Sequence, residues 1–263
     1  MIVWLNGALV PADAPGIAPT DRGFTLGDGL FETMRVAQGT VLRLEAHLAR
    51  LAAGAQVLAL PLAGLALADA VAAVVAANAV DTGVVRLTVT RGSGPRGVLP
   101  PRDPRPTVLA SAAASPAAQA APARVMTCTV TRRNEMSPLS RIKSLNYLDN
   151  ILARQEADAH GLDDAILLNT RGRVAEASYA NLFAVCDGVL VTPPIAEGAL
   201  PGIMRAEILT HGAREQALSP QDLQGAEEVF LSTSLGLRPV AELDGRAFAG
   251  GHPVCARLSH LLG

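Results

Sequence analysis

The chain contains almost no lysine. Of its 22 basic residues only one, Lys143, is a lysine, and all the others are arginines. Arginine cannot lose its proton and form an imine, whereas a partly desolvated lysine can, because burial lowers its pKa. The plain alternative for Lys143 is a solvated surface side chain. Any imine formed by a lysine side chain of this chain must nevertheless use Lys143.

Long hydrophobic runs, aromatic residues and excess charge are also scarce. The longest apolar run, Ala70 to Val80, is interrupted by Asn78, and a membrane span needs about 18 apolar residues. A net charge of −2 provides no basic face for nucleic acid. The N-terminus lacks the charged start and the cleavage site of a signal peptide. We therefore expect a cytoplasmic protein that binds neither a membrane nor nucleic acid.

Cysteine is rare as well. Cys128, Cys186 and Cys255 are odd in number and far apart, which favours reduced thiols over disulfides or metal ligands. No metal site is predicted from the sequence.

The 263 residues are enough for one large domain or two modest ones. Ser111 to Ala123 is a low-complexity stretch with two prolines and no large side chain to bury, which is typical of a linker. We therefore predict an N-terminal domain over residues 1–113, a linker over 114–123 and a C-terminal domain over 124–263. Helices and strands are mixed without strict βαβ alternation, which favours an α/β or mixed α+β fold with two domains and a cleft between them.

Hydrophobic periodicity predicts the individual elements. A hairpin is expected over 3–10, with Asn6-Gly7 as its turn. Alternation over 30–36 predicts a strand with Phe31, Thr33 and Arg35 on one face. Further strands are expected at 84–90, 107–110, 125–131, 165–168, 181–186, 189–191 and 229–232. Helices are expected at 45–58, 65–77, from 147 onward, 202–209 and 254–262.

Three motifs stand in a characteristic order along the chain. Lys143 lies in Ile-Lys-Ser-Leu-Asn-Tyr-Leu, where a loop passes into a predicted helix. Glu176-Ala-Ser-Tyr-Ala-Asn-Leu-Phe and then Leu200-Pro-Gly-Ile-Met-Arg follow. This arrangement resembles the class IV, or fold type IV, pyridoxal-phosphate enzymes from about residue 3 to residue 240. That family includes D-amino-acid and branched-chain aminotransferases and 4-amino-4-deoxychorismate lyases. The resemblance implies a homodimer with the cofactor in the interdomain cleft.

The resemblance also implies a set of residues for pyridoxal 5′-phosphate. Lys143 would form the imine and move the proton at the substrate's alpha carbon, and Glu176 would keep the pyridine nitrogen protonated. The start of a helix at Gly202, Ile203 and Met204 would bind the phosphate, since free backbone N–H groups there attract anions. The other residues that match cofactor contacts of the family are Arg50, Tyr147, Leu200 and Thr233.

The substrate residues combine features of several subfamilies. The Arg91-Gly-Ser-Gly-Pro-Arg-Gly motif resembles the lyases, and Arg96 matches the arginine that binds a carboxylate in the D-specific aminotransferases. Leu30 and Val98 replace the Tyr and His that those enzymes place beside it. Arg35 instead resembles an arginine of the branched-chain enzymes and the lyases.

The predicted function is therefore transamination between small amino acids, or amines, and 2-oxo acids, carried out through Lys143. The runner-up is 4-amino-4-deoxychorismate lyase, which would use the same lysine to eliminate pyruvate. A non-catalytic protein that binds a small molecule is a third class, but the intact Lys143, Glu176 and Arg50 argue against it.

Overall fold

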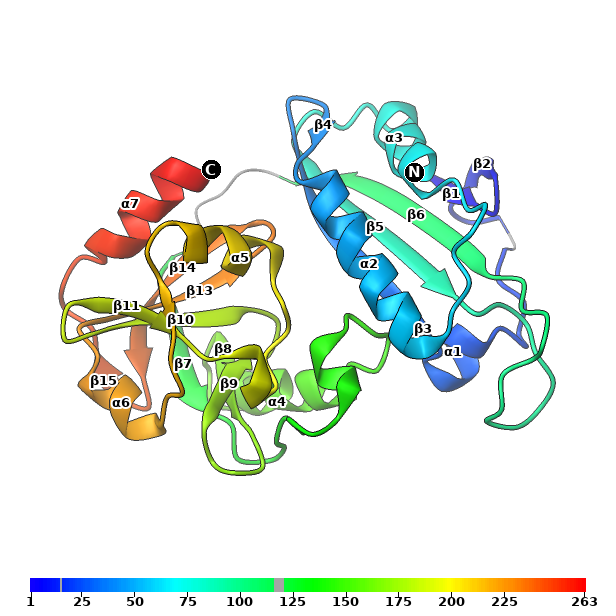
Figure 1. The fold of residues 1–263 in the computed structure, drawn as a ribbon. Helices are drawn as coiled ribbons and strands as arrows, with labels where there is room; N and C mark the ends of the chain where they lie inside the picture. The colour runs from blue at the N-terminus through cyan, green and yellow to red at the C-terminus, as the bar shows by residue number, and fades with distance from the viewer. Residues whose placement is uncertain (15, 116–120) are drawn as a thin grey trace. The chain divides into compact units, whose positions relative to one another are not determined.

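The computed structural model describes residues 1–14, 16–115 and 121–263. The chain divides into two compact units (Figure 1). Unit 1 comprises Met1–Ala117 together with Ile142–Asn146, and unit 2 comprises Ala118–Arg141 together with Tyr147–Gly263. The predicted linker, residues 114–123, includes 116–120, which lie outside the described residues. The short segment that carries Lys143 thus belongs to unit 1, although its neighbours on both sides belong to unit 2.

Unit 1 is an antiparallel sheet of six strands in the order β2-β1-β6-β5-β3-β4. Its strands are β1 Ile2–Leu5, β2 Ala8–Pro11, β3 Gly29–Ala37, β4 Thr40–Val41, β5 Gly83–Thr90 and β6 Thr107–Ala114. Its helices are α1 Arg22–Leu26, α2 Leu44–Leu58 and α3 Leu67–Ala77. Helices α2 and α3 cover one face of this sheet and bury the core against it (Figure 1).

Strand β3 shows why one face of the sheet is buried and the other is not. Leu30, Met34 and Val36 are at most 1% exposed and belong to the core under the helices. Their neighbours Thr33 and Arg35 lie on the opposite face and are half-buried. The predicted alternation over 30–36 is confirmed.

Unit 2 contains a nine-stranded mixed sheet with the path β12-β11-β10-β13-β14-β7-β8-β9, and β15 pairs with β14. Its strands are β7 Ala123–Thr127, β8 Asp164–Leu168, β9 Val174–Ala177, β10 Asn181–Cys186, β11 Val189–Thr192, β12 Arg214–Glu215, β13 Glu228–Thr233, β14 Gly236–Leu243 and β15 Arg246–Ala247. Its α-helices are α4 Leu148–Ala159, α5 Ile203–Thr210, α6 Pro220–Gly225 and α7 Pro253–Leu262. Short 3-10 helices span Pro138–Arg141 and Ile195–Glu197.

Aromatic packing fixes the centre of unit 2. The rings of Phe183 in β10 and Phe230 in β13 stack with their centroids 5.2 Å apart, and both side chains are fully buried. They share a cluster with Met204 and Ile208 of α5 and Leu258 of α7. Helix α5, whose first residues are predicted phosphate ligands, is therefore anchored on the sheet by its buried face.

Most predicted elements are confirmed, and the differences have local causes. The low-complexity stretch is in part a strand, because β6 runs to Ala114 where small residues pair with β5. Strands β9, β12, β14 and β15 and the short helices α1 and α6 were not predicted. No helix in the described ranges combines the length and hydropathy needed to cross a membrane. Among the same residues, no group of His, Cys, Asp and Glu is arranged to hold a metal ion.

Candidate active site

The segment around Lys143 lies along the edge of β3. The backbone N–H of Phe31 donates to the Lys143 carbonyl oxygen at 3.0 Å, and the N–H of Leu145 donates to the Gly29 carbonyl at 3.0 Å. Strand β4 pairs with β3 only at Val36 and Ala37, so the edge near Gly29 is open to this segment. The backbone of Lys143 is thus held by residues more than a hundred positions earlier in the chain.

A glycine at position 29 is required by this pairing. A Cβ atom there would lie 2.6 Å from the Val89 carbonyl oxygen and 2.9 Å from Cδ1 of Leu145. Ile142 secures the other end of the segment, since its side chain is 7% exposed and belongs to the core that contains α2. Any side chain at position 29 would therefore push the Lys143 segment away from the sheet.

Lys143 is half-buried, and its side chain lies beside an aromatic ring. Its Nζ is 4.4 Å from the ring centroid of Phe31, and Cζ of Arg86 is 3.9 Å from the same centroid. Arg35 is on the same face of β3 as Phe31, whereas the side chain of Leu30 points into the core. Phe31 and Arg86 were not predicted as site residues, although the alternation of β3 places Phe31 and Arg35 on one face.

Arg50 is part of a buried charged cluster in unit 1. Its Nε and Nη2 atoms lie 2.8 and 2.5 Å from the two carboxylate oxygens of Glu32. Nδ1 of His47 is 2.7 Å from Glu32 as well, and Glu32 is completely buried. Burial by itself would raise the pKa of Glu32, but the hydrogen bonds from His47 and Arg50 outweigh it and lower that pKa. The cluster fixes the Arg50 guanidinium on α2, and its role as a phosphate ligand stays a prediction.

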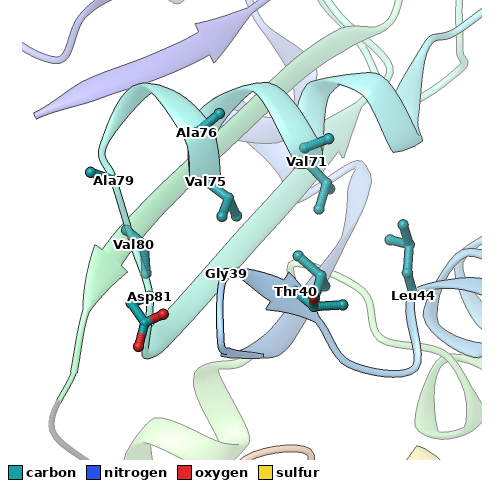
Figure 2. A pocket seen from close by; sticks show the side chains of 11 residues that line it. Gly39, Thr40, Leu44, Val71, Val75, Ala76, Ala79, Val80 and Asp81 are labelled. Carbon is teal, nitrogen blue, oxygen red and sulfur yellow. The ribbon is translucent and has the colours of Figure 1, made fainter.

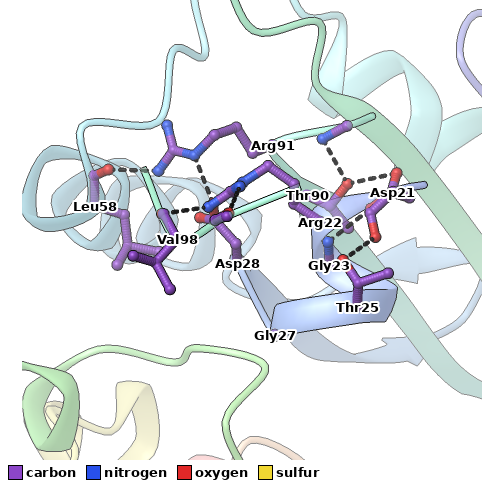
Figure 3. A network of polar contacts seen from close by, with 12 residues as sticks. Asp21, Arg22, Gly23, Thr25, Gly27, Asp28, Leu58, Thr90, Arg91 and Val98 are labelled. Carbon is purple, nitrogen blue, oxygen red and sulfur yellow. Dashed lines mark hydrogen bonds and ion pairs between the residues drawn. The ribbon is translucent and has the colours of Figure 1, made fainter. Parts of the chain in front are cut away.

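A second charged network holds the glycine-rich loop after β5 (Figure 3). Arg22, which is 3% exposed, donates from Nη1 to the Gly97 carbonyl at 2.9 Å and from Nη2 to the Val98 carbonyl at 2.8 Å. Nε of Arg22 and Nε of Arg91 each lie 2.8 Å from the same oxygen of Asp28. Desolvation opposes ionisation of Asp28, but the bonds from Arg91 and Arg22 lower its pKa. Two buried arginines therefore fix the backbone of this loop.

The predicted substrate residues of that loop point outward from unit 1. The side chains of Arg96 and Val98 are exposed, and Val98 is 84% exposed. Within unit 1 they do not join the group formed by Lys143, Phe31 and Arg86. Contact of Arg96 or Val98 with a substrate stays a prediction.

A pocket of about 550 Å³ lies elsewhere in unit 1, between α3 and the turn that joins β3 to β4 (Figure 2). Its walls are mostly apolar and include Leu44, Val71, Val75 and Val80, with Asp81 at the rim. None of the predicted site residues lines this pocket. It is therefore a feature separate from the candidate active site.

Glu176 lies in β9 of unit 2 and is 5% exposed, so it is not a surface residue of a turn. Its Oε2 accepts from the backbone N–H of Leu200 at 2.9 Å and from Nδ2 of Asn181 at 3.3 Å. Its Oε1 is 3.1 Å from Nη2 of Arg133. All three of these partners are donors, and an ionised carboxylate satisfies them. Arg133 and Asn181 were missed as site residues because their contacts to Glu176 depend on tertiary structure.

The start of α5 lies close to this carboxylate in space, because Leu200, which donates to Glu176, is two residues before Gly202. Gly202 is the N-cap residue and offers no side-chain cap for the first-turn N–H groups of Ile203 and Met204. A Cβ atom at Gly202 would lie 1.9 Å from Oδ1 of Asn181, whose amide also donates to the Leu200 carbonyl at 2.9 Å. The Met204 side chain is buried in the core, so only its backbone faces the helix start.

The remaining predicted cofactor residues lie in unit 2. Thr233 ends β13 and its hydroxyl accepts from the Leu235 N–H at 3.1 Å. Leu200 and Tyr147 are half-buried, and Tyr147 immediately precedes α4. A buried carboxylate beside an uncapped helix start matches a ligand that has a cationic nitrogen and a phosphate. The donor set of unit 2 therefore fits pyridoxal 5′-phosphate.

The sequence is similar to those of several described proteins over nearly the whole chain. The sequence profile of the family described as amino-transferase class IV matches residues 29–243. A putative branched-chain-amino-acid aminotransferase of Methanocaldococcus jannaschii is 35% identical, with 94% of this chain and 89% of that protein covered. A D-alanine aminotransferase of Listeria monocytogenes is 33% identical, with 98% and 93% covered.

Solved structures agree with these relatives. The branched-chain aminotransferase of Escherichia coli superimposes with a TM-score of 0.91 at 29% identity, covering 98% of this chain and 91% of that chain. The 4-amino-4-deoxychorismate lyase of Pseudomonas aeruginosa has a TM-score of 0.87 at 37% identity, with 99% and 97% covered. A further branched-chain aminotransferase, solved with pyridoxamine 5′-phosphate, has a TM-score of 0.90 at 28% identity, with 99% and 92% covered.

The predicted family and fold class are both confirmed by these matches. The family profile spans most of the chain, and the relatives are covered over most of their own length. This protein therefore belongs to the class IV aminotransferase family.

Proposed function

We propose that the protein is a pyridoxal-phosphate-dependent aminotransferase that moves an amino group between small amino acids, or amines, and 2-oxo acids. One observation carries the proposal. The chain's only lysine is half-buried, its backbone is bonded to β3, and its Nζ lies against Phe31. A lysine amine can attack a carbonyl, which no arginine of this chain can do.

The residues that would hold pyridoxal 5′-phosphate are those that the family resemblance predicts. Lys143 and Arg50 belong to unit 1, and Tyr147, Glu176, Leu200, Gly202, Ile203, Met204 and Thr233 belong to unit 2. The cofactor supplies an electron sink for the charge released at the substrate's alpha carbon. A related enzyme that was solved with pyridoxamine 5′-phosphate supports this choice of cofactor.

Each residue then has a defined task. Lys143 would hold the cofactor covalently through its amine and move the proton at the alpha carbon. Glu176 would hold a proton on the pyridine nitrogen, because an ionised carboxylate favours the cationic form of its partner. The first N–H groups of α5 and the Arg50 guanidinium would hold the phosphate.

The substrate carboxylate needs a cation outside the cofactor contacts. Arg96 and Arg35 are the candidates that the sequence provides, and Arg86 joins them because it lies over the same ring as Lys143. Val98, in the same loop as Arg96, would shape the substrate site, whereas Leu30 would act only by supporting β3 from the core.

One observation supports the second candidate function, 4-amino-4-deoxychorismate lyase. The Pseudomonas aeruginosa lyase is more similar in sequence, at 37% identity, than the Escherichia coli aminotransferase, at 29%. A lyase would use the same Lys143 and Glu176 but would release pyruvate from aminodeoxychorismate. A homodimer, which the family resemblance implies, and a cytoplasmic location, which the composition favours, remain predictions.

One assay separates these activities. The cofactor-loaded enzyme is incubated with a 2-oxo acid as amino acceptor and with D-alanine, L-leucine or an (R)-amine as donor, or with aminodeoxychorismate alone. The formation of the donor's keto acid or ketone, or of aminobenzoate, is followed. Transamination of at least one of the first three donors supports the proposal, whereas aminobenzoate alone supports the lyase. No turnover of any of the four would contradict both.

The same assay on Arg96→Leu tests the carboxylate role. Loss of a charge-assisted pair should cost about 2–5 kcal/mol, or roughly thirty- to several-thousand-fold in kcat/KM, for amino acids but not for the (R)-amine. Equal losses for both would assign the role to Arg35 or Arg86 instead.

A further inference from the structure

We propose that Arg133 is a positioning residue that keeps Glu176 ionised and correctly placed for the cofactor's ring nitrogen. The inference rests on the proposed function, in which that nitrogen is the partner of Glu176. Nη2 of Arg133 lies 3.1 Å from Oε1 of Glu176, and the two side chains are 13% and 7% exposed. Water therefore screens this pair far less than it screens a surface ion pair.

Arg133 is itself held by two carbonyl oxygens of unit 2. Its Nη2 donates to the Ser140 carbonyl at 2.8 Å, and its Nε lies 3.2 Å from the Gly198 carbonyl. Ser140 is three residues before Lys143 in the chain, and Gly198 is four residues before Gly202, which caps α5. The guanidinium of Arg133 thus contacts three groups: the segment that leads to Lys143, the segment that leads to α5, and the carboxylate of Glu176.

The three contacts of Glu176 described above differ in charge and in the oxygen that they bind. Asn181 and the Leu200 N–H bind Oε2, so they fix the direction of the carboxylate. They are neutral donors, whereas Arg133 binds Oε1 and is the charged partner among these three contacts. A buried carboxylate without a cation nearby takes up a proton more readily, because desolvation penalises its charged form. A neutral Glu176 could no longer stabilise a protonated pyridine nitrogen.

Arg133 provides a permanent positive charge. Arginine keeps its proton at every pH at which the enzyme works, and its planar fork suits two acceptors at once. The structure therefore has a fixed positive charge behind Glu176, on the side of Oε1. In the cofactor-bound enzyme this charge would bias the shared proton toward the ring nitrogen.

The test reads the ring nitrogen directly. The wild-type protein and the variants Arg133→Met, Arg133→Lys and Arg132→Met are loaded with ¹⁵N-labelled pyridoxal 5′-phosphate. The ¹⁵N chemical shift of the ring is then followed from about pH 6 to pH 9. Arg132 is the matched control, since it is an exposed neighbour whose guanidinium binds the backbone carbonyls of Cys128 and Thr131.

We expect a protonated ring nitrogen in the wild type, in Arg133→Lys and in Arg132→Met. In Arg133→Met the shift should move toward the unprotonated value, and kcat should fall roughly ten- to a hundredfold, as is usual when the support of a catalytic group is removed. A chemical shift in Arg133→Met equal to that of the wild type at every pH would overturn the inference.

Two further outcomes are separated by design. Arg133→Gln keeps an uncharged polar side chain whose amide ends near the position of the Arg133 Nε, which faces the Gly198 carbonyl. It therefore replaces Arg133→Met if that variant does not fold, and the same shift is expected of it. If the wild type binds no cofactor, the proposed function fails. If the wild type binds cofactor and the uncharged variants resemble it, only the role of Arg133 fails.

Discussion

Glu176 shows how much a single residue depends on its surroundings. Its carboxylate is buried, and its two oxygens accept from a backbone N–H and an asparagine amide and pair with an arginine. The glutamate was identified by resemblance to a motif, but its partners lie 43 residues before and up to 24 residues after it in the chain. The chemistry of this position is therefore set by tertiary structure as much as by the motif.

Replacing Glu176 with Gln should leave the cofactor bound while reducing turnover by about a hundredfold or more. A neutral amide cannot hold a proton on the ring nitrogen, so the charge developing at the alpha carbon loses its electron sink. Cofactor content by absorbance and kcat for a reactive donor measure the two effects separately. Near-normal kcat in a variant that retains cofactor would contradict the assigned role.

Asp164 is a second buried carboxyl group of unit 2, with a different balance of partners. One oxygen accepts from the Ser178 hydroxyl and from the Ala165 N–H, but Oδ2 has no hydrogen-bond partner within the described structure. Burial is the largest influence and raises the pKa of Asp164 above its ordinary value of 3.8. In the folded protein the protonated form is thus favoured over a wider pH range.

This shift has a defined sign for stability. Below pH 3.8 Asp164 is protonated in both the folded and the unfolded state, so it has no effect. As pH rises through 3.8 toward the higher folded-state pKa, only the unfolded state loses the proton, and the folded state becomes relatively less stable. Asp164→Asn should therefore gain stability relative to the wild type as pH rises above 3.8, until the folded-state pKa is passed. Urea unfolding at several pH values tests this, and a difference that does not change with pH would refute it.

Among the elements, the glycine-rich loop after β5 shows how a flexible sequence is made rigid. Arg22 binds the carbonyl oxygens of Gly97 and Val98, directly after Arg96. Arg22→Met should release this loop and expose the Arg96–Gly97 bond to trypsin. Cleavage at that bond should be several-fold faster than in the wild type or in Arg102→Met, an exposed neighbour used as control. Equal cleavage rates in all three proteins would show that Arg22 does not hold the loop.

Strand β3 and helix α2 show which elements could be predicted from the sequence. The alternation along β3 and the helical periodicity of α2 are local patterns, and both elements were predicted within two residues of their bounds. The pairing of residues 143–145 with β3 joins segments far apart in the chain, so no local pattern reports it. Phe31 and Arg86 beside Lys143 were missed for that reason.

Resemblance and structure contribute differently to the candidate site. The motifs supplied Lys143, Glu176 and the start of α5. The contacts of Arg133, Asn181 and Arg22 required coordinates, because each is a side chain that reaches another segment. The placement of Leu30 in the core also required them, since alternation alone does not say which face of a strand is covered.

For the whole molecule, the proposed function requires that one lysine bind the cofactor. Lys143 belongs to unit 1 and Glu176 to unit 2, so no local segment contains the complete set of predicted ligands. Because Lys143 is the only lysine, the claim can be tested without ambiguity about which side chain reacts.

The most direct measurement is reduction of the cofactor-loaded protein with borohydride, followed by digestion and mass spectrometry. We predict a phosphopyridoxyl group on the peptide that contains Lys143, and none in Lys143→Ala treated in the same way. We also predict that turnover is lost in that variant, because no other lysine can replace the missing amine. If borohydride fixes no cofactor to the wild-type chain, or fixes it only to the α-amino group of Met1, the assignment of Lys143 is wrong.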